Sequence, residues 1–438
     1  MVQLKHMLNK FKDFGDSLVS KVKKSKPGSD EQYIVGLDIG TEFIKALIGR
    51  VNGDEIEIIG VGRAHQELSD MQSGAVSDIA SVVQNCDEAL SQAEQAAGVS
   101  ARTTVIGIAG ELVKGTTTTV RCSRKSPSKP LDVTEMERII KLVQDRALAK
   151  AKQQIAYEMG GKPVELRLVN SALVTIEIDG YKVTNPIGFQ GKDVVIQLYT
   201  AFAPMIHLGA LEKIAEELDL DLLAVAAEPF AVARSVIGDN PNASMSAILM
   251  DVGGGTTDIA VVNDGGVQGT KMFGIGGRAY SRSVERDLNV EFVQAEQLKL
   301  GLSDGTTPKS KIAAVEKSLT KTADVWIRGV ELALSEFTQL DHLPYRMLLC
   351  GGGSSLDVLV DTIQKSDWYS ELPFTRKPVI QHLHPEQVVG ITDTTGEVTD
   401  HTFITAMGLL RVGLDTQQYA GSGGVDSIKE KIDRMLRV

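Results

Sequence analysis

The sequence predicts an α/β protein in which one strand–loop–strand unit occurs twice. The first copy begins with IVGLDIGT at 34–41, and the second begins with ILMDVGGGTTD at 248–258. In each copy an apolar run typical of a buried strand ends at an aspartate, and glycine and threonine follow it. A second apolar run then leads to an Asn-Gly or Asp-Gly turn. Because sequence and local structure repeat together, the pattern indicates a duplicated architecture rather than coincidence.

Length and composition limit the classes of protein that fit this chain. Its 438 residues allow two to four domains. The net charge of -11 argues against a general nucleic-acid-binding protein, because a phosphate backbone would be repelled. Cys86, Cys122 and Cys350 lack the spacing of metal ligands, which predicts neither a zinc site nor a disulfide framework and favours a reducing cytoplasm. The sequence contains no uninterrupted apolar run of about 18 residues, so no membrane span is predicted.

Residues 1–29 are predicted to form a basic amphipathic helix. Seven lysines against two aspartates give this segment a charge of plus 5. Its apolar side chains share one face, within an arc of roughly 140°: Leu4, Met7, Leu8, Phe11, Phe14, Leu18, Val19 and Val22. The pattern suits a helix lying on anionic lipid, and it equally suits a helix docked on the protein's own core.

The loops of the two copies have the chemistry of a polyphosphate site. Glycines let backbone N–H groups approach an anion, and a threonine adds a hydroxyl donor. An aspartate at the end of a strand, here Asp38 and Asp251, can hold a divalent cation through water. Two such loops facing each other would grip a polyphosphate from both sides.

Between the copies, Glu228-Pro229 follows the apolar run 220–227 and marks the start of a helix. The carboxylate of Glu228 could orient a water molecule, although a Glu-Pro pair is also an ordinary way to begin a helix. Ahead of it, residues 116–204 show an α+β pattern without convergent acids and bases. Strands are expected at 165–178 and 193–203, with a helix at 134–158.

After the second copy, two segments fit a base and a sugar. Glu296 and Lys299 lie three residues apart in a predicted helical stretch at 280–302, so they share one helix face. They could hydrogen-bond ribose and base edges, or form a surface ion pair. A strand at 348–350 then ends in the glycine loop 351–355, where missing side chains leave room for a flat base.

The chain is predicted to end in a tethered amphipathic helix. Residues 416–425 have the composition of a flexible linker. In the following segment, 426–438, Ile428, Ile432 and Met435 share one face with basic residues around them. Because so short a helix is marginal alone in water, this pattern favours binding to a membrane or a partner.

In this order, the motifs resemble the five nucleotide motifs of the actin/Hsp70/sugar-kinase superfamily. Phosphate 1, connect 1, phosphate 2, adenosine and connect 2 are matched by 38–41, 228–233, 251–258, 351–354 and 405–408. Within the superfamily the chain most resembles FtsA, the actin-like family of bacterial cell division, over roughly residues 33 to 415. The segment IDGYKVTNPIGFQG at 178–191 is similar to the FtsA signature in the inserted subdomain 1C.

The resemblance implies an actin-like (ribonuclease H-like) two-lobed ATPase fold with a small inserted α+β subdomain, 1C, of the SHS2 type. The expected domains follow the helix at 1–29 in this order: lobe 1 at 30–115, the 1C subdomain at 116–204, the return of lobe 1 at 205–240, lobe 2 at 241–415, the linker at 416–425 and the C-terminal helix at 426–438.

The resemblance also implies ATP with Mg²⁺ in the cleft between the lobes. Asp38 and Asp251 would hold the hydrated metal, and Glu228, with Asp251, would serve catalysis by positioning the attacking water. The remaining matches would contact phosphates (Gly40, Thr41, Gly253, Gly254, Gly255, Thr256) or surround ribose and adenine (Gly276, Gly277, Glu296, Lys299, Gly351, Gly352, Ser354). Backbone donors and a metal would neutralise charge in this chemistry.

As a function, the resemblance implies a filament-forming adaptor peripheral to the inner face of the cytoplasmic membrane at the division site. It would bind the C-terminal tail of FtsZ and an anionic membrane, and recruit other division proteins through the 1C subdomain, without nucleic acid. The phosphate 1 loop departs from the FtsA pattern, because Glu42 and Phe43 stand where Thr or Ser and then Lys usually follow. This departure predicts slow or vestigial hydrolysis.

Two alternatives follow from the same residues. The spacing of Lys45 is closer to PilM, the actin-like scaffold of type IV pilus machines, whereas the tethered C-terminal helix and the segment 185–188 favour FtsA. The third class, an Hsp70-like or sugar-kinase-like ATPase, is disfavoured. The sequence shows no acidic catalytic loop for a sugar and no room for a substrate-binding domain after the ATPase motifs.

Overall fold

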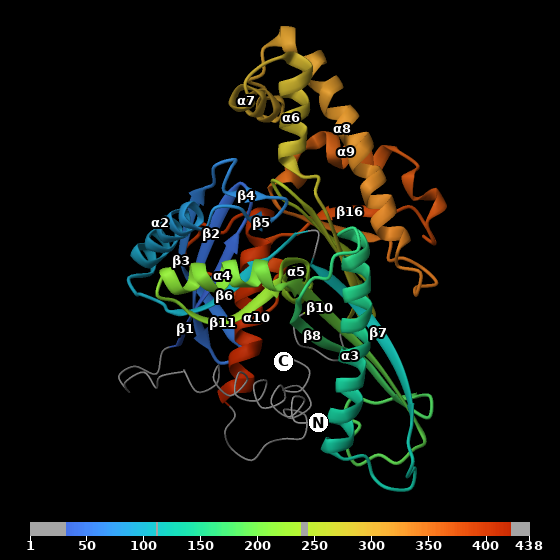
Figure 1. Cartoon of the computed structure of the whole chain (residues 1–438). Coiled ribbons are helices and arrows are strands. Elements are labelled where there is room, and N and C mark those ends of the chain that lie inside the picture. Colours follow the sequence, from blue (N-terminus) through green and yellow to red (C-terminus); the bar gives the residue numbers. More distant parts are fainter. Residues whose placement is uncertain (1–31, 111–112, 238–243, 422–438) are drawn as a thin grey trace. The chain divides into compact units, whose positions relative to one another are not determined.

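The computed structural model describes residues 32–110, 113–237 and 244–421, and Tyr33–Val438 form one compact unit (Figure 1). The helices predicted at 1–29 and 426–438 lie outside the described residues. Among the described residues, no helix combines the length and apolar character that crossing a bilayer requires.

Two sheets carry the two copies of the repeat. The first has six strands, in the order β11 (Asp221–Ala227), β6 (Thr103–Ile108), β1 (Gln32–Ile39), β2 (Phe43–Asn52), β3 (Glu55–His65) and β17 (Ile391–Asp393). The second begins with β16 (Val379–His382), β15 (Arg346–Cys350), β12 (Ala247–Val252), β13 (Thr257–Asn263) and β14 (Gly266–Phe273). Each copy therefore supplies the third and fourth strands of its sheet.

The duplication predicted from the sequence extends to the strand order. In the first sheet β1 is flanked by the parallel strands β6 and β11 on one side and by the β2–β3 hairpin on the other. In the second, β12 has β15 and β16 in parallel on one side and the β13–β14 hairpin on the other. Gly53, Asp264 and Gly265 have positive φ angles, as the expected hairpin turns require.

Helices cover both faces of the first sheet (Figure 1). Helices α2 (Ile79–Ala97) and α4 (Met205–Glu217) pack on one face, and α5 (Glu228–Ile237) and α10 (Ile404–Gly421) pack on the other. Asp78 caps α2, because its side chain accepts hydrogen bonds from the N–H groups of Ala80 and Ser81. A short hairpin, β4 (Met71–Gln72) with β5 (Ala75–Val76), lies between β3 and α2 in the sequence.

The second sheet has its own helices and its own core. Helices α6 (Gly277–Leu288), α7 (Phe292–Ser303), α8 (Lys309–Ser335) and α9 (Asp357–Lys365) pack together beside it (Figure 1). Trp326 of α8 is fully buried in this core, and its indole N–H donates to the Thr257 hydroxyl at 2.9 Å. The face of the second sheet that meets these helices therefore has its own hydrophobic cluster, whereas residues of the other face, such as Leu249 and Val262, belong to the same cluster as the first half.

The second sheet continues into the segment between β6 and α4. After β14 come β7 (Lys114–Ser123), β10 (Asp193–Pro204), β8 (Leu166–Ile178) and β9 (Tyr181–Lys182), and α3 (Val133–Glu158) packs on these strands. The strands and the helix expected here are confirmed to within two residues. β14 and β7 pair only at Gly269 with Thr116 and at Thr270 with Gly115.

The part of this segment that lies away from the first half has a hydrophobic cluster of its own, which includes Met136 and Ile140 of α3 and Ile196 of β10. The C-terminal end of β10 belongs instead to the core of the first half, because Tyr199 and Ala201 are buried there. Tyr199 stacks on Phe230 of α5 at 5.4 Å between ring centroids. The segment 116–204 thus shares part of its packing with the first half.

Candidate functional site

A cavity of about 650 Å³ lies where the loops of the two copies meet. Thirteen of the sixteen candidate positions line it: Asp38, Gly40, Thr41, Glu228, Asp251, Gly253, Gly254, Thr256, Gly277, Glu296, Lys299, Gly351 and Gly352. They come from both halves, as the sequence predicted, and the volume falls in the range of small-molecule sites.

Gly255, Gly276 and Ser354 do not line this cavity. A side chain at Gly276 would lie 2.6 Å from the carbonyl oxygen of Gly253, so a glycine is needed for close approach of the two loops. Ser354 is fully buried, and its hydroxyl donates to the Gly351 carbonyl at 2.7 Å. These two positions shape the loops that carry the lining residues.

Four buried carboxyl groups and one lysine form the floor of the cavity. Asp38 ends β1, Asp251 lies in β12, Asp258 lies in β13 and Glu228 begins α5, and each is less than a tenth exposed. The Nζ of Lys45, on β2, lies 2.9 Å from Asp38 Oδ2. Burial opposes the charge of Lys45, but attraction to Asp38 outweighs it and raises the pKa of the ammonium group.

Asp251, Asp258 and Glu228 hold their protons more tightly than usual. Burial, followed by the charge of Asp38, raises the pKa of Asp251. Burial and the charge of Asp251 raise the pKa of Asp258 to about 8, although the Thr256 hydroxyl donates to it at 2.9 Å. Burial and the neighbouring aspartates raise the pKa of Glu228 well above its ordinary value. The floor thus holds four carboxyl groups against a single ammonium group.

The Oδ1 atom of Asp258 has no hydrogen-bond partner in the part of the chain that the structure describes. An unpaired buried carboxylate oxygen is costly. In the same described part, no three His, Cys, Asp or Glu side chains are grouped closely enough to hold a metal ion by themselves. A divalent cation at this floor would therefore need further oxygen ligands, which water or a phosphate can supply.

Asp251 is held in place by residues from two neighbouring loops or helices. Gly351 has a φ of 79°, and a side chain there would collide with Asp251 Oδ1. The Thr405 hydroxyl, from α10, donates to the other oxygen, Oδ2. Asp251 is thus held from the second half by the 351–353 loop and from the first half by α10.

Glu296 and Lys299 form an ion pair at 2.8 Å on α7, and both line the cavity. The Ser281 hydroxyl donates to Glu296, and the Lys299 ammonium donates to the Gly277 carbonyl at 3.2 Å. Lys299 is only 5% exposed. The pair therefore fixes the start of α6 against α7 and lines the cavity, so it is not the exposed surface pair that the sequence also allowed.

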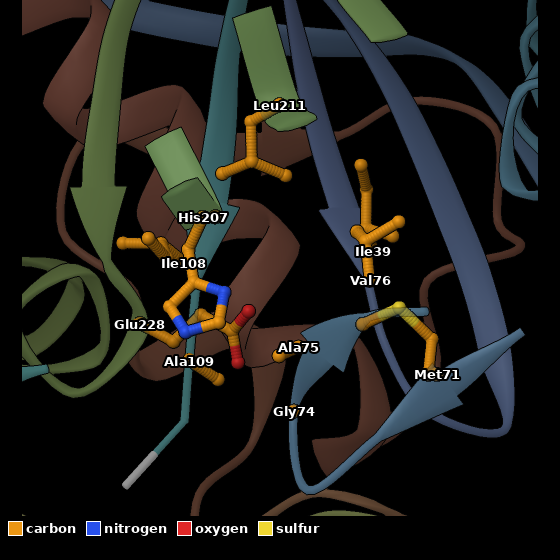
Figure 2. A pocket seen from close by; sticks show the side chains of 11 residues that line it. Ile39, Met71, Gly74, Ala75, Val76, Ile108, Ala109, His207, Leu211 and Glu228 are labelled. Carbon is orange, nitrogen blue, oxygen red and sulfur yellow. The ribbon is translucent and has the colours of Figure 1, made fainter. Parts of the chain in front are cut away.

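Behind Glu228 lies a second, much smaller chamber of about 10 Å³, about the space of one water molecule (Figure 2). Glu228, Gly74 and Ala109 line both this chamber and the main cavity. His207, on α4, lines its far side, and burial lowers the pKa of this imidazole. Glu228 thus separates the main cavity from a mostly apolar chamber.

Glu42 lines the cavity but is not left as an isolated negative charge. Its Oε2 atom lies 2.7 Å from Nε of Arg278, the second residue of α6. Its Oε1 atom lies 3.1 Å from Nε2 of His65. No role of Arg278 or Asp258 was predicted from the sequence. The second copy of the repeat contains a second aspartate, Asp258, which the first copy lacks, and this difference could have pointed to it.

Comparisons with known proteins find similarity to bacterial cell-division proteins. The family model for cell division protein FtsA matches residues 248–408. Cell division protein FtsA of Pseudomonas aeruginosa is 25% identical over 408 residues, which cover 88% of this chain and 90% of that protein. FtsA of Streptococcus pneumoniae is 24% identical over 355 residues, covering 76% and 74%.

A solved structure, the PilM-PilN type IV pilus biogenesis complex, matches in fold. Its TM-score is 0.62 at 15% sequence identity, and the match covers 87% of this chain and 98% of that one. At this level of identity the likeness concerns the arrangement of helices and strands, not the function.

Proposed function

We infer the function from the premise that this chain is a distant relative of the FtsA proteins with an actin-like, two-lobed α/β fold. On this proposal the chain binds ATP with Mg²⁺ in the 650 Å³ cavity and acts as a membrane adaptor in bacterial cell division. The observation that carries the nucleotide part is the floor of four buried carboxyl groups beside a single lysine, under loops from both halves. Such a floor has more carboxyl groups than its one ammonium group can balance, and a divalent cation would supply further positive charge.

The residues present fit Mg²⁺ and a triphosphate. Asp38 and Asp251, with Asp258 beside them, would hold the hydrated cation, which neutralises phosphate charge when bound. Backbone N–H groups of the loops containing Gly40 and Gly253–Thr256 would face the phosphates. Gly277, Glu296, Lys299 and the loop at 351–352 would surround ribose and adenine, while Gly255, Gly276 and Ser354 would support these loops from behind.

We expect hydrolysis to be slow even where binding is tight. Glu228 lies where it could accept a proton from water, but burial and neighbouring aspartates raise its pKa well above the ordinary value, which disfavours the charged form that would accept the proton. Arg278 is paired with Glu42 and is not free to neutralise phosphate charge. Steady-state phosphate release should be well below the enzymatic median of about 10 per second, and a rate near that median would contradict this expectation.

Membrane attachment is proposed for the segments 1–29 and 426–438. One lipid-binding element usually gives marginal, reversible attachment, and two give a stable one. The charge of plus 5 on the N-terminal segment should make its share salt-sensitive, since each lysine near anionic lipid contributes about 1 kcal/mol at low salt.

The test is flotation with anionic vesicles of the full chain and of truncations lacking 1–28, 421–438 or both. We expect the double truncation to stay unbound and the N-terminal truncation to lose most of the salt dependence. If removing 1–28 changes neither binding nor its salt dependence, the N-terminal part of the proposal is wrong.

The same assay tests the division role. With the C-terminal peptide of FtsZ added, the full chain should carry that peptide to the vesicles. A peptide from the cytoplasmic segment of a pilus membrane protein, added instead, should stay behind. Capture of the pilus peptide and not of the FtsZ tail would favour the PilM-like alternative, which the likeness in fold leaves open.

Contacts with other copies and with division proteins are proposed for the far part of the segment 116–204. Deleting the whole segment would also remove Tyr199 and Ala201 from the core of the first half, so substitutions are the sharper test. At the far tip, Tyr181 is 77% exposed and Phe189 is 50% exposed. Exposed large apolar side chains of this kind are common anchors of protein contacts.

Changing both Tyr181 and Phe189 to serine is expected to abolish ATP-dependent pelleting of the protein while leaving ATP affinity unchanged. Tyr157→Ser is the matched control, because Tyr157 is 87% exposed near the opposite end of α3. Pelleting of the double variant at the level of the control would contradict the proposed role of the tip.

A further inference from the structure

The ion pair between Glu42 and Arg278 joins the two halves of the cleft. Glu42 lies in the loop between β1 and β2, in the first sheet, whereas Arg278 lies at the start of α6, which follows the second sheet's β14. The Nε of Arg278 is 2.7 Å from Glu42 Oε2 although 236 residues separate the two in sequence. The pair exists only while the loops of the two copies stay together.

Arg278 also contacts the first half at a second point. Its Nη2 atom donates to the carbonyl oxygen of Gln66 at 3.4 Å. Gln66 is fully buried and fixed, since its amide donates to the Gly40 carbonyl at 3.2 Å and accepts from Asn85 at 2.8 Å. The guanidinium group therefore bridges a side chain and a backbone carbonyl of the opposite half.

Little water reaches this pair. The Arg278 side chain is 13% exposed and that of Glu42 is 27% exposed, so attraction between them is screened less than in an exposed pair. His65 lies against the other oxygen of Glu42, and the charge of Glu42 also acts on Arg63. Without Arg278, the remaining partners of Glu42 would be His65 and the charge of Arg63, which hold Glu42 more weakly.

The loops are in van der Waals contact around the pair. A side chain at Gly255 would lie 2.8 Å from the Thr41 hydroxyl oxygen, and one at Gly254 would lie 3.0 Å from Cβ of Glu42. Both Glu42 and Arg278 line the cavity. A ligand as large as a nucleoside triphosphate passes between these loops only if the two halves separate, and separation breaks the ion pair.

We propose that Glu42 and Arg278 form a tie across the cleft that limits the rate of nucleotide exchange. The proposal rests on the proposed function, because it takes the ligand of the cavity to be a nucleotide. The tie acts on the separation of the two halves and not on a phosphate group. Weakening it therefore speeds release without removing a ligand of the nucleotide.

The first experiment measures the dissociation rate of a fluorescent ATP analogue in the presence of Mg²⁺. Glu42→Gln and Arg278→Gln should each raise this rate on the order of tenfold, the effect of about 1.4 kcal/mol. The double variant should be no faster than either single variant, and the exchanged pair Glu42→Arg with Arg278→Glu should return the rate to within about twofold of the original.

Glu57→Gln is the matched control. It breaks an ion pair of similar length, 2.6 Å to Arg50, that lies within the first sheet alone. This variant should release nucleotide at the original rate. Unchanged release in both single variants would overturn the proposal. Slower release in Glu42→Gln would also overturn it, because it would mean that Arg278 binds phosphate and Glu42 merely competes.

A second measurement needs no nucleotide and separates the tie from the proposed function. Spin labels at Ser91→Cys on α2 and Gln294→Cys on α7, both exposed positions in opposite halves, report the distance between the halves in a Cys122→Ser background. Glu42→Gln should broaden this distance distribution toward longer values. An unchanged distribution contradicts the tie, whereas absence of nucleotide binding in the original protein contradicts only the proposed function.

Discussion

Replacing Asp251 by asparagine is expected to lower the affinity for Mg²⁺-ATP on the order of 100-fold or more while the nucleotide-free protein becomes no less stable. The variant removes a negative charge that would compensate the cation, in a site from which most water is excluded. The amide oxygen of the asparagine still accepts the hydrogen bond of Thr405, so the neighbouring helix keeps its partner.

The lower affinity and the unchanged stability expected of this variant have one cause. Burial raises the pKa of Asp251, which means that its charged form is disfavoured in the nucleotide-free fold. Calorimetry should show the lost affinity, and thermal unfolding should show an unchanged or higher midpoint. Asp361→Asn, which affects an exposed ion pair with Lys365 on α9, is the control that should change neither. Unchanged ATP affinity in Asp251→Asn would remove this residue from the site.

The nucleotide-free protein should lose stability as the pH rises from 6 to 8. The pKa of Asp258 is about 8 in the folded state and near 3.8 in the unfolded chain, so over this range the folded state binds more protons than the unfolded one. Stability therefore falls with rising pH between roughly pH 4 and 8. One such proton is worth about 1.4 kcal/mol per pH unit, which gives a loss of about 2 kcal/mol over this interval.

The raised pKa values of Glu228 and Asp251 act in the same direction, while that of Lys45 acts only above its ordinary value of 10.5. Urea unfolding at pH 6, 7 and 8 measures the slope. Asp258→Asn should flatten it, because the amide does not titrate, and Mg²⁺-ATP should flatten it as well. A slope that is the same in Asp258→Asn and in the original protein would show that this carboxyl group is not responsible.

Much of the site could be predicted because its residues stand at the ends of strands. Asp38 and Asp251 occupy equivalent places in the two copies, and the parallel order of each sheet brings the following loops to one cavity. The glycine loop at 351–353 follows β15 for the same reason. Strand ends are visible in a sequence as apolar runs that stop at glycine and aspartate.

The pairings across the cleft could not be predicted in this way. The sequence showed Glu42 as an unfavourable charge, since nothing local reveals that Arg278, 236 residues later, reaches it. It also could not distinguish glycines that line the cavity from those that support it, such as Gly276, because both occur in the same motif. Such choices depend on how the two halves approach each other, which no pattern within one segment encodes.

The narrow junction between β14 and β7 gives the molecule a mechanical property. β7 follows β6 of the first half in the chain and pairs with β10 on one side, yet its other neighbour, β14, belongs to the second half and pairs with it over only two residue pairs. Tyr199 and the Thr117 hydroxyl, which donates to the Val267 carbonyl at 2.6 Å, reinforce the same short joint. A segment that is anchored to both halves of the cleft must shift or rotate whenever the halves separate. The orientation of its distant tip should therefore change with the separation of the two halves.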